Sequence, residues 1–422
     1  MKNYEEFLSD IKDLIAVKSV SGTPETNAPF GKGPKKALDL FLSIAKRMGF
    51  STKEYDGYAG EVTFGEGMEI GIIGHLDVVP EGDGWNSPPY ELTRKDGMLI
   101  GRGIMDDKGP SLLCLYALKE LKDEGVLPKK KFRFIVGTNE ETGWKDIDYL
   151  KEHVALPEYG FSPDGDFPVV YSEKGMGEVE FSLPKLKYFT DLKGGTVVNA
   201  VCGYAEVKEV KDPDFALLEK YGLSFDNGVI KSYGVSAHGS RPETGKNAIL
   251  PLFSYMAERG EDLENIIDCV FRDKFGLFKT ENEQGFISIS AGVVCEDNAG
   301  VKLTCDLRVP APFTFKTATD IIDNFGVPYK LTVRHDTQYL GKEDWFLNVL
   351  LDAYRKATGE TFAQPIAQRG STFARAFARG CAFGPEIPGT VRTIHAPNER
   401  ISEEDLLKIY DVYKETLKAL SE

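Results

Sequence analysis

Polar side chains that follow a short apolar stretch have the types and spacing needed for metal-dependent chemistry. The stretch Ile70–Ile73 leads into Gly74-His75-Leu76-Asp77, and its Ile and Gly content indicates a buried strand. Side chains alternate between the two faces of a strand, so His75 and Asp77 point to the same side. Open α/β sheets bind ligands at the carboxyl ends of their strands, which is where this histidine and carboxylate would stand.

A glycine-rich turn, residues 101–103, leads to a second pair of acidic residues. Asp106 and Asp107 come next, and the apolar residues 111–124 that follow are typical of a helix. Carboxylates are favoured at a helix N-terminus, so either aspartate could be an ordinary helix cap. The alternative hypothesis is that His75 and Asp106 share a metal centre, which requires further ligands from the rest of the chain.

Two later strand ends and one loop carry such ligands. The expected strand at 131–137 ends in a sequence that carries Glu140 and Glu141, and the next strand-end sequence carries Asp164. His395 lies in a Pro/Asn loop before the last helix. Strands that alternate with helices form βαβ units, which bring such strand ends to one edge of a mostly parallel sheet.

A two-metal hydrolytic site needs terminal ligands for each ion, a carboxylate that bridges both ions, and a base for the water between them. Carboxylate oxygen and imidazole nitrogen suit zinc and similar divalent ions. In a loop at a strand end, one of two adjacent glutamates can bind a metal while the other faces the water. The candidate ligands are His75, Asp106, Glu140 or Glu141, Asp164 and His395.

Length and composition describe an ordinary globular protein. The chain has 422 residues, of which 41% are hydrophobic and 28% charged, enough for two domains or for one domain with a large insertion. The net charge of -15 argues against a nucleic-acid surface. The six cysteines form no CxxC pair, which suits a reducing cytosol. The N-terminal sequence is not typical of a signal peptide and no stretch approaches a membrane span, so we expect a cytoplasmic protein without a membrane partner.

The pattern of elements changes twice along the chain. Residues 1–174 alternate between strands and helices, residues 175–339 resemble antiparallel strands with helices between them, and a helix resumes at 343–356. The chain ends in an amphipathic helix that Ser402 is expected to cap. We therefore predict an α/β catalytic domain, residues 1–174 and 340–422, with a mixed, mostly parallel sheet and flanking helices. An α+β domain, residues 175–339, is inserted into it.

Four ordered motifs resemble those of the co-catalytic zinc peptidase family, which includes carboxypeptidase G, aminoacylases, acetylornithine deacetylase and succinyl-diaminopimelate desuccinylase. They are HLDVVP at 75–80, GRGIMDDKG at 101–109, TNEETG at 138–143 and SPDGDFP at 162–168. Three further sequences are most similar to the PepV-type dipeptidases of that family: EKG at 173–175, GSTFAR at 370–375 and HAPNER at 395–400. The resemblance implies a metallodipeptidase fold in which the inserted domain is a lid.

The resemblance also implies a ligand assignment for two divalent metal ions. Asp106 would bridge them, His75 and Asp164 would hold one ion, and Glu141 and His395 would hold the other. Zinc is the expected metal, and manganese or cobalt would also fit a site rich in carboxylates.

The same resemblance assigns roles to the residues around the metals. Asp77 would orient His75, and Glu140 would be the general base and then the general acid. His238, from the lid domain, would stabilise the oxyanion of the tetrahedral intermediate. Four residues would hold the carbonyl and the C-terminal carboxylate of a small peptide substrate: Asn199, Arg308, Ser371 and Thr372.

Two features depart from the PepV-type pattern. The chain is short for that type, and Arg369 stands where another glycine is expected. Both concern the selection of substrate size rather than the metal chemistry. The expected assembly is a monomer or a homodimer joined by the lid domain.

Three other functions compete with hydrolysis of unblocked dipeptides. An N-acyl-amino-acid deacylase or desuccinylase would use the same two-metal centre. A serine hydrolase built on Ser371 or Ser240 lacks a GxSxG elbow and leaves the carboxylates without a role. A catalytically silent metal-binding protein would lack a base, whereas Glu140 is present.

Overall fold

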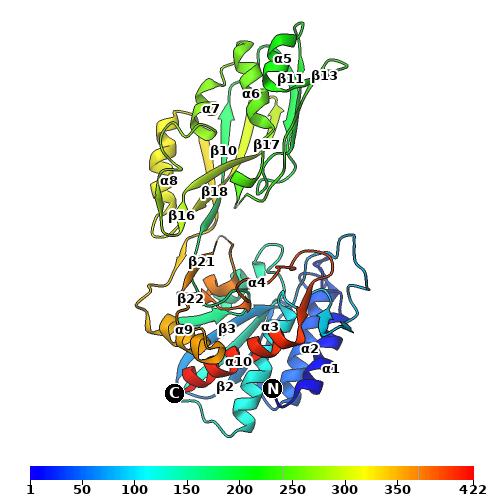
Figure 1. The fold of residues 1–422 in the computed structure, drawn as a ribbon, viewed down its shortest axis with the longest axis vertical. Coiled ribbons are helices and arrows are strands. Elements are labelled where there is room, and N and C mark those ends of the chain that lie inside the picture. Colours follow the sequence, from blue (N-terminus) through cyan, green and yellow to red (C-terminus); the bar gives the residue numbers. More distant parts are fainter. Residues whose placement is uncertain (240, 369) are drawn as a thin grey trace. The chain divides into compact units, whose positions relative to one another are not determined.

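The computed structural model describes residues 1–239, 241–368 and 370–422. Ser240 and Arg369, both named above, lie outside the described residues. The chain forms two compact units: the first is Met1–Tyr171 together with Tyr339–Glu422, and the second is Ser172–Gln338. In Figure 1 the blue N-terminal and red C-terminal segments both belong to the first unit. Each unit has its own hydrophobic core and its own mixed or antiparallel sheet, so the predicted fold class is confirmed.

The main sheet of the first unit is parallel at its centre and has antiparallel pairs on both sides, β2 with β6 on one and β9 with β22 on the other. Strands β6, β3, β7 and β22 lie side by side and run parallel, whereas β1 and β2 continue the sheet from β6 in antiparallel pairs. The strands are β1 (Ser51–Tyr55), β2 (Ala59–Phe64), β3 (Met68–His75), β6 (Lys130–Gly137), β7 (Tyr159–Ser162), β9 (Val170–Glu173), β20 (Gln338–Tyr339), β21 (Ile366–Gln368) and β22 (Arg379–Ala382).

Helices cover this sheet and shorter strands support the loops at its edge. The helices are α1 (Tyr4–Ile15), α2 (Lys32–Arg47), α3 (Lys108–Asp123), α4 (Lys145–His153), α9 (Trp345–Thr358) and α10 (Glu403–Ser421), with a 3-10 turn η3 (Phe373–Ala376). The short strands are β4 (Thr93–Lys95), β5 (Met98–Ile100), β24 (Arg400–Ser402), β8 (Gly165–Asp166) and β23 (Pro385–Glu386). The hydroxyl of Ser402 accepts a hydrogen bond from the backbone N–H of Asp405, which confirms the predicted cap of the last helix.

Burial explains why β3 and α3 form at the centre of the unit. The last six residues of β3 are buried, as expected for a strand with parallel neighbours and helices on both faces. Helix α3 is apolar on nearly every side and lies within the core. These two elements carry His75 and Asp107 at their ends, so the rigid core of the unit fixes both positions.

The second unit has an α+β fold, an antiparallel sheet combined with helices. Its sheet has the order β13-β14-β12-β11-β17-β18-β10-β19, and its pairs are antiparallel. The strands are β10 (Gly175–Leu183), β11 (Phe189–Gly194), β12 (Tyr204–Glu209), β13 (Ser224–Asp226), β14 (Val229–Tyr233), β17 (Ser288–Asp297), β18 (Gly300–Val309) and β19 (Tyr329–His335), with a small hairpin of β15 (Glu281–Asn282) and β16 (Gly285–Phe286). The helical elements are α5 (Phe215–Tyr221), η1 (Pro242–Thr244), α6 (Ile249–Glu258), α7 (Glu264–Val270), α8 (Phe315–Ile322) and η2 (Asp323–Phe325), and Figure 1 labels the α-helices in green and yellow.

None of the helices in the described part of the chain is both long enough and apolar enough to cross a membrane.

Candidate metal centre

The candidate site lies where three neighbouring strands of the first unit end side by side. His75, the last residue of β3, is the register partner of Gly137, the last residue of β6, and the backbone N–H of Leu76 donates to the carbonyl of Gly137 at 3.0 Å. Strand β7, the other parallel neighbour of β3, ends at Ser162, two residues before Asp164. The loops after these strands therefore leave the same edge of the sheet, as the sequence predicted.

Asp106 lies between two histidines. The Nε2 atom of His75 is 3.0 Å from Oδ1 of Asp106, and the Nε2 atom of His395 is 2.9 Å from Oδ2 of the same carboxylate. Nε2 of His395 also lies 3.1 Å from Oε2 of Glu141. Oδ2 of Asp164 lies 3.7 Å from Nε2 of His75. The two oxygens of one carboxylate thus face two different histidines, which is the arrangement a bridging ligand requires.

Two groups of potential ligand atoms share His75. In one, the ligand atoms of His75, Asp106 and Glu141 lie within 4.8 Å of one another, and in the other those of His75, Glu140 and Asp164 do. Each of the five expected metal ligands therefore lies close to at least one other expected ligand. Glu140, the expected base, also lies among them, beside His75 and Asp164, which would hold one ion.

Asp77 organises the loop that carries both glutamates. Its two carboxylate oxygens accept hydrogen bonds from the backbone N–H groups of Glu140 and Glu141, at 3.0 and 3.1 Å. The Nδ1 atom of His75 lies 3.0 Å from the backbone oxygen of Asp77 and 3.5 Å from its carboxylate. Asp77 therefore fixes the ring of His75 and the glutamate loop together, and leaves Nε2 of His75 facing the site.

Burial and crowding perturb the ionisation of these groups. Burial raises the pKa of Glu140 well above its usual range, with Glu141 adding to the shift although His75 opposes it. Burial and then Asp106 raise the pKa of Asp164 in the same way. Hydrogen bonds with Asp106 and Glu141 raise the pKa of His395 to about 11. Carboxylates packed this closely repel one another unless a positive charge lies between them.

The donor set fits divalent metal ions. Four carboxylates and two imidazoles gather in two overlapping groups whose ligand atoms lie within 4.8 Å of one another or, for His395, within 3.1 Å of Asp106 and Glu141. Oxygen and nitrogen donors of this kind suit zinc, manganese or cobalt. Burial would lower the pKa of His75, but Asp106 and Asp77 outweigh this effect and raise it. A cation placed among these groups would remove the need for protons on the carboxylates.

Glu399 is a supporting residue to which the sequence analysis gave no role. Its side chain is fully buried and one oxygen accepts from Nη1 of the buried Arg102 at 2.8 Å and from the N–H of Gly103 at 3.0 Å. The other oxygen accepts from the N–H groups of Met105 and Asp106, at 2.8 and 3.2 Å. Glu399 follows His395 by four residues, so one carboxylate joins the loop of His395 to the loop of Asp106. In the sequence, Glu399 was indicated only as part of the HAPNER motif at 395–400.

Two other buried aspartates shape the same loops. Asp107 stands at the N-cap position of α3, but its carboxylate accepts from the N–H of His75 at 3.1 Å and from Oγ of Ser111 at 2.8 Å rather than capping the helix. Asp146 accepts from the N–H groups of Thr138 and Asn139, at 2.7 and 2.9 Å, just before the two glutamates. The simple helix-cap interpretation of Asp107 is therefore wrong, because the side chain reaches the neighbouring strand instead.

Thr372 and Ser371 belong to the loop before η3. Thr372 is nearly fully buried, and its Oγ1 accepts from the N–H of Ala374 at 3.3 Å, which caps the short turn. Phe373 of this turn packs edge-on against the ring of His75, with centroids 6.2 Å apart. The loop that carries Ser371 and Thr372 thus lies beside the candidate metal centre.

The remaining expected residues gather within the second unit. Ala200 and His238 form a β-bridge, and the N–H of Gly239 donates to the carbonyl of Asn199 at 2.7 Å. A Cβ atom at Gly239 would lie 2.6 Å from Oδ2 of Asp306, so the loop after His238 packs directly against that carboxylate. Asp306 in turn accepts from Nε of Arg308 at 2.8 Å. Asn199, His238 and Arg308 are therefore neighbours, as a common role in substrate binding requires.

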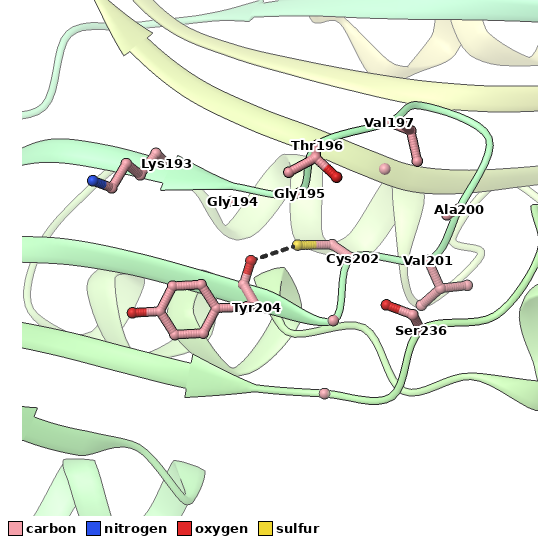
Figure 2. A pocket seen from close by; sticks show the side chains of 13 residues that line it. Lys193, Gly194, Gly195, Thr196, Val197, Ala200, Val201, Cys202, Tyr204 and Ser236 are labelled. Atoms are coloured by element: carbon pink, nitrogen blue, oxygen red, sulfur yellow. Dashed lines mark hydrogen bonds between the residues drawn. The ribbon is translucent and has the colours of Figure 1, made fainter. Parts of the chain in front are cut away.

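A hollow of about 590 Å³ in the second unit is lined in part by Val197, Ala200 and Val201, which flank Asn199 in the sequence. Figure 2 shows its walls, which are largely glycine backbone with Thr196, Val197, Val201 and Ser236. The thiol of Cys202 donates to the carbonyl of Tyr204 at 3.0 Å. This hollow holds none of the residues expected to act on a substrate.

Comparison with known proteins decides the family. The model of peptidase family M20/M25/M40 matches residues 71–419, which include every candidate site residue. This protein belongs to that family. A Staphylococcus aureus (strain MW2) protein, named provisionally as a dipeptidase, is 33% identical over 461 aligned positions, with 100% of this chain and 98% of the relative covered. This M20 family member is thus a hydrolase of the peptidase class.

Two solved structures share the fold. Human carnosine dipeptidase 1 has a TM-score of 0.56 and 16% identity, with 99% of this chain and 97% of that chain covered. A Bacillus subtilis protein described as a dinuclear metal binding peptidase of the M20 family has a TM-score of 0.52 and 10% identity, with 99% and 97% covered. The alignment with the staphylococcal relative is longer than this chain, so the relative has residues that this M20 peptidase lacks, as the short length had suggested.

Proposed function

We propose that this M20 peptidase is a metal-dependent dipeptidase that hydrolyses the peptide bond of unblocked dipeptides. The observation that carries the proposal is the carboxylate of Asp106, whose two oxygens face Nε2 of His75 and Nε2 of His395. A centre with one carboxylate between two such donors is suited to two ions. The names of the staphylococcal relative and of the dinuclear Bacillus subtilis peptidase support this choice.

In this proposal His75, Asp106 and Asp164 would hold one divalent ion. Asp106, Glu141 and His395 would hold the other. When bound, the ions would lower the pKa of a water molecule and polarise the substrate carbonyl. Zinc is the metal we expect, with manganese and cobalt as alternatives.

Glu140 acts as the general base and then the general acid. Its carboxylate lies among the ligand atoms of His75 and Asp164, which is where an attacking water must lose its proton. Burial raises the pKa of Glu140 above its usual range, with Glu141 adding to the shift although His75 opposes it. Glu140 then passes that proton to the leaving amine. Asp77 holds the N–H of Glu140 and so fixes the direction from which the base acts.

The second unit supplies the groups that bind the substrate. His238 stabilises the negative charge that develops on the carbonyl oxygen, and Asn199 donates to the same part of the substrate. Arg308 binds the C-terminal carboxylate, for which the guanidinium fork is suited. Ser371 and Thr372, in the first unit, complete the set of substrate contacts.

An assay with two substrate classes tests this proposal. Purified protein supplied with zinc or manganese is given unblocked dipeptides, and in parallel N-acetyl and N-succinyl amino acids. The proposal predicts turnover of the dipeptides. If only the acylated compounds are hydrolysed, the protein is instead an N-acyl-amino-acid deacylase or desuccinylase on the same centre. Retention of full activity in a metal chelator would exclude both functions.

A further inference from the structure

A cavity of about 290 Å³ lies in the first unit, where β5, β24, α10 and the segment 385–393 contribute to its wall. A volume of this order suits one small organic molecule. None of the described residues in its lining is an expected metal ligand or substrate-binding residue, so the cavity is not part of the catalytic site proposed above. Most of the wall is apolar and includes Met98, Met105, Ile387, Ile401 and Ile409.

Glu386 contributes a buried carboxylate to this wall. The residue is only 8% exposed, and its Oε1 atom has no hydrogen-bond partner among the described residues. Nε of Arg392 lies 3.7 Å from that oxygen, which is beyond hydrogen-bond distance. Arg392 is about half exposed, and its Nη1 atom lies 3.4 Å from Oδ1 of Asp166, so its charge is shared between two carboxylates. Oε1 of Glu386 therefore lacks the hydrogen bond that a buried carboxylate oxygen normally accepts.

A carboxylate in this position is poorly stabilised by the chain itself. Burial of a charged oxygen without a hydrogen bond costs free energy, because the oxygen has lost its water and gained no donor. Burial accordingly raises the pKa of Glu386 to about 7, although Arg392 opposes the shift. A donor that enters the cavity would remove part of this cost, and a positively charged donor would remove most of it.

The other charged side chains of the wall are engaged within the chain. Oδ2 of Asp405 accepts from the hydroxyl of Ser402 at 2.7 Å, at the first turn of α10. Nη1 of Arg400 donates to the carbonyl of Asn398 at 3.3 Å. Glu386 is therefore the charged group of this wall that has most to gain from a ligand.

We propose that this cavity binds a small primary amine with an apolar body, whose ammonium group donates to Glu386. An ammonium group carries three donors on a compact charge, so one of them can reach the carboxylate while the hydrocarbon packs against the apolar wall. Simple aliphatic amines and free aliphatic amino acids share this chemistry. The inference does not rest on the proposed function, because binding is measured without turnover.

Ligand-observed NMR titration of the full chain supplied with zinc tests the site. Isoamylamine should bind tighter than isoamyl alcohol, which has the same hydrocarbon without the charge, by about 10-fold or more. Glu386→Gln should weaken binding of the amine by about 10–100-fold, because a charge-assisted hydrogen bond is lost. The variant should fold, since Oε1 gives up no hydrogen bond.

Two further variants make the comparison specific. Arg392→Gln removes a cation that competes for the same carboxylate, so it should tighten binding of the amine. Glu404→Gln is the control, because it makes the same change of charge on α10 at an exposed position outside the cavity lining. This control should leave binding of the amine unchanged.

A comparison of leucine with isoamylamine identifies the source of the amine. Leucine adds a carboxylate to the same ammonium group and hydrocarbon. Tighter binding of leucine that Glu386→Gln weakens would assign the cavity to free amino acids, and tighter binding of isoamylamine would assign it to simple amines.

Four results would overturn the inference. They are no binding of isoamylamine, equal binding of the amine and the alcohol, binding of the amine that Glu386→Gln leaves unchanged, and binding that disappears when the protein is stripped of metal. The last result would place the amine on the metal ions. Because Gln has nearly the shape of a protonated Glu, unchanged binding in Glu386→Gln would also show that the charge of Glu386 does not hold the ligand.

Discussion

Replacement of Glu399 by Gln should destabilise the first unit and loosen its metal centre. The carboxylate is fully buried and accepts four hydrogen bonds, one from the buried Arg102 and three from backbone N–H groups. The variant keeps the size of the side chain, but its NH₂ group cannot accept and must face at least one of these donors. It also removes the charge that compensates Arg102.

The magnitude follows from the uncompensated charge. Breaking a buried ion pair by neutralising one partner costs about 3–5 kcal/mol. For units of about 150–250 residues, each kcal/mol lowers Tm by about 2–4 °C, so we expect a fall of about 6–20 °C for the first unit. Two of the backbone donors belong to Met105 and Asp106. The variant should therefore also loosen Asp106, the proposed shared ligand, and metal affinity should fall by about 10–100-fold.

Calorimetric melting of metal-free protein and zinc titration measure the two effects. Glu403→Gln is the matched control, because Glu403 binds Arg94 through two hydrogen bonds of 2.8 and 2.7 Å at a more exposed position. A surface pair of this kind contributes about 0–1 kcal/mol, and the control should leave zinc binding unchanged. If Glu399→Gln melts within about 4 °C of wild type, as the control is expected to, the role given to the buried pair is refuted.

Three further predictions concern the catalytic base, its support and an ion pair far from the metals. Glu140→Gln should keep both metal ions, counted by elemental analysis, while turnover falls by about 10²–10⁴-fold; loss of a metal ion would make Glu140 a ligand instead. Asp77→Asn should weaken zinc binding by about 10–100-fold in calorimetry, since Asp77 holds the N–H groups of Glu140 and Glu141; unchanged affinity would contradict this support. Burial opposes ionisation of Glu120, but Lys414 and Tyr410 outweigh it and lower its pKa from 4.5 to about 2. The stability of wild type over Glu120→Gln should therefore be fully present above pH 4.5 and disappear as the pH falls through about 2, measured by urea unfolding; a constant difference would show that ionisation of Glu120 does not matter.

The parts of the site that depend on local pattern could be predicted from the sequence. The apolar stretch before His75 forms the buried strand β3, and strand alternation with helices brings the loops of Glu141 and Asp164 to the same sheet edge. Ser402 caps the last helix as its position before three acidic residues implies. These features follow from periodicity and capping, which act over a few residues.

The supporting contacts could not be predicted, because they join residues far apart in the chain. Asp77 reaches backbone groups of Glu140 and Glu141, and Asp107 reaches the backbone of His75. Glu399 binds a loop almost three hundred residues earlier. No local pattern tells a carboxylate that binds metal from one that binds buried amides, since both are acidic residues in glycine-rich loops. Arg308 and Asp306 are an exception, because residues two apart in a strand share a face.

The most direct test of the central claim is a metal titration of stripped protein, followed by dipeptide hydrolysis. Zinc, and separately manganese, is added while bound metal and turnover are measured together. A bridged centre at Asp106 predicts that activity returns as two equivalents bind and that Asp106→Ala abolishes this return. Binding of fewer than two equivalents by wild type, or full activity with one, would contradict the two-metal centre from which the proposed function is built.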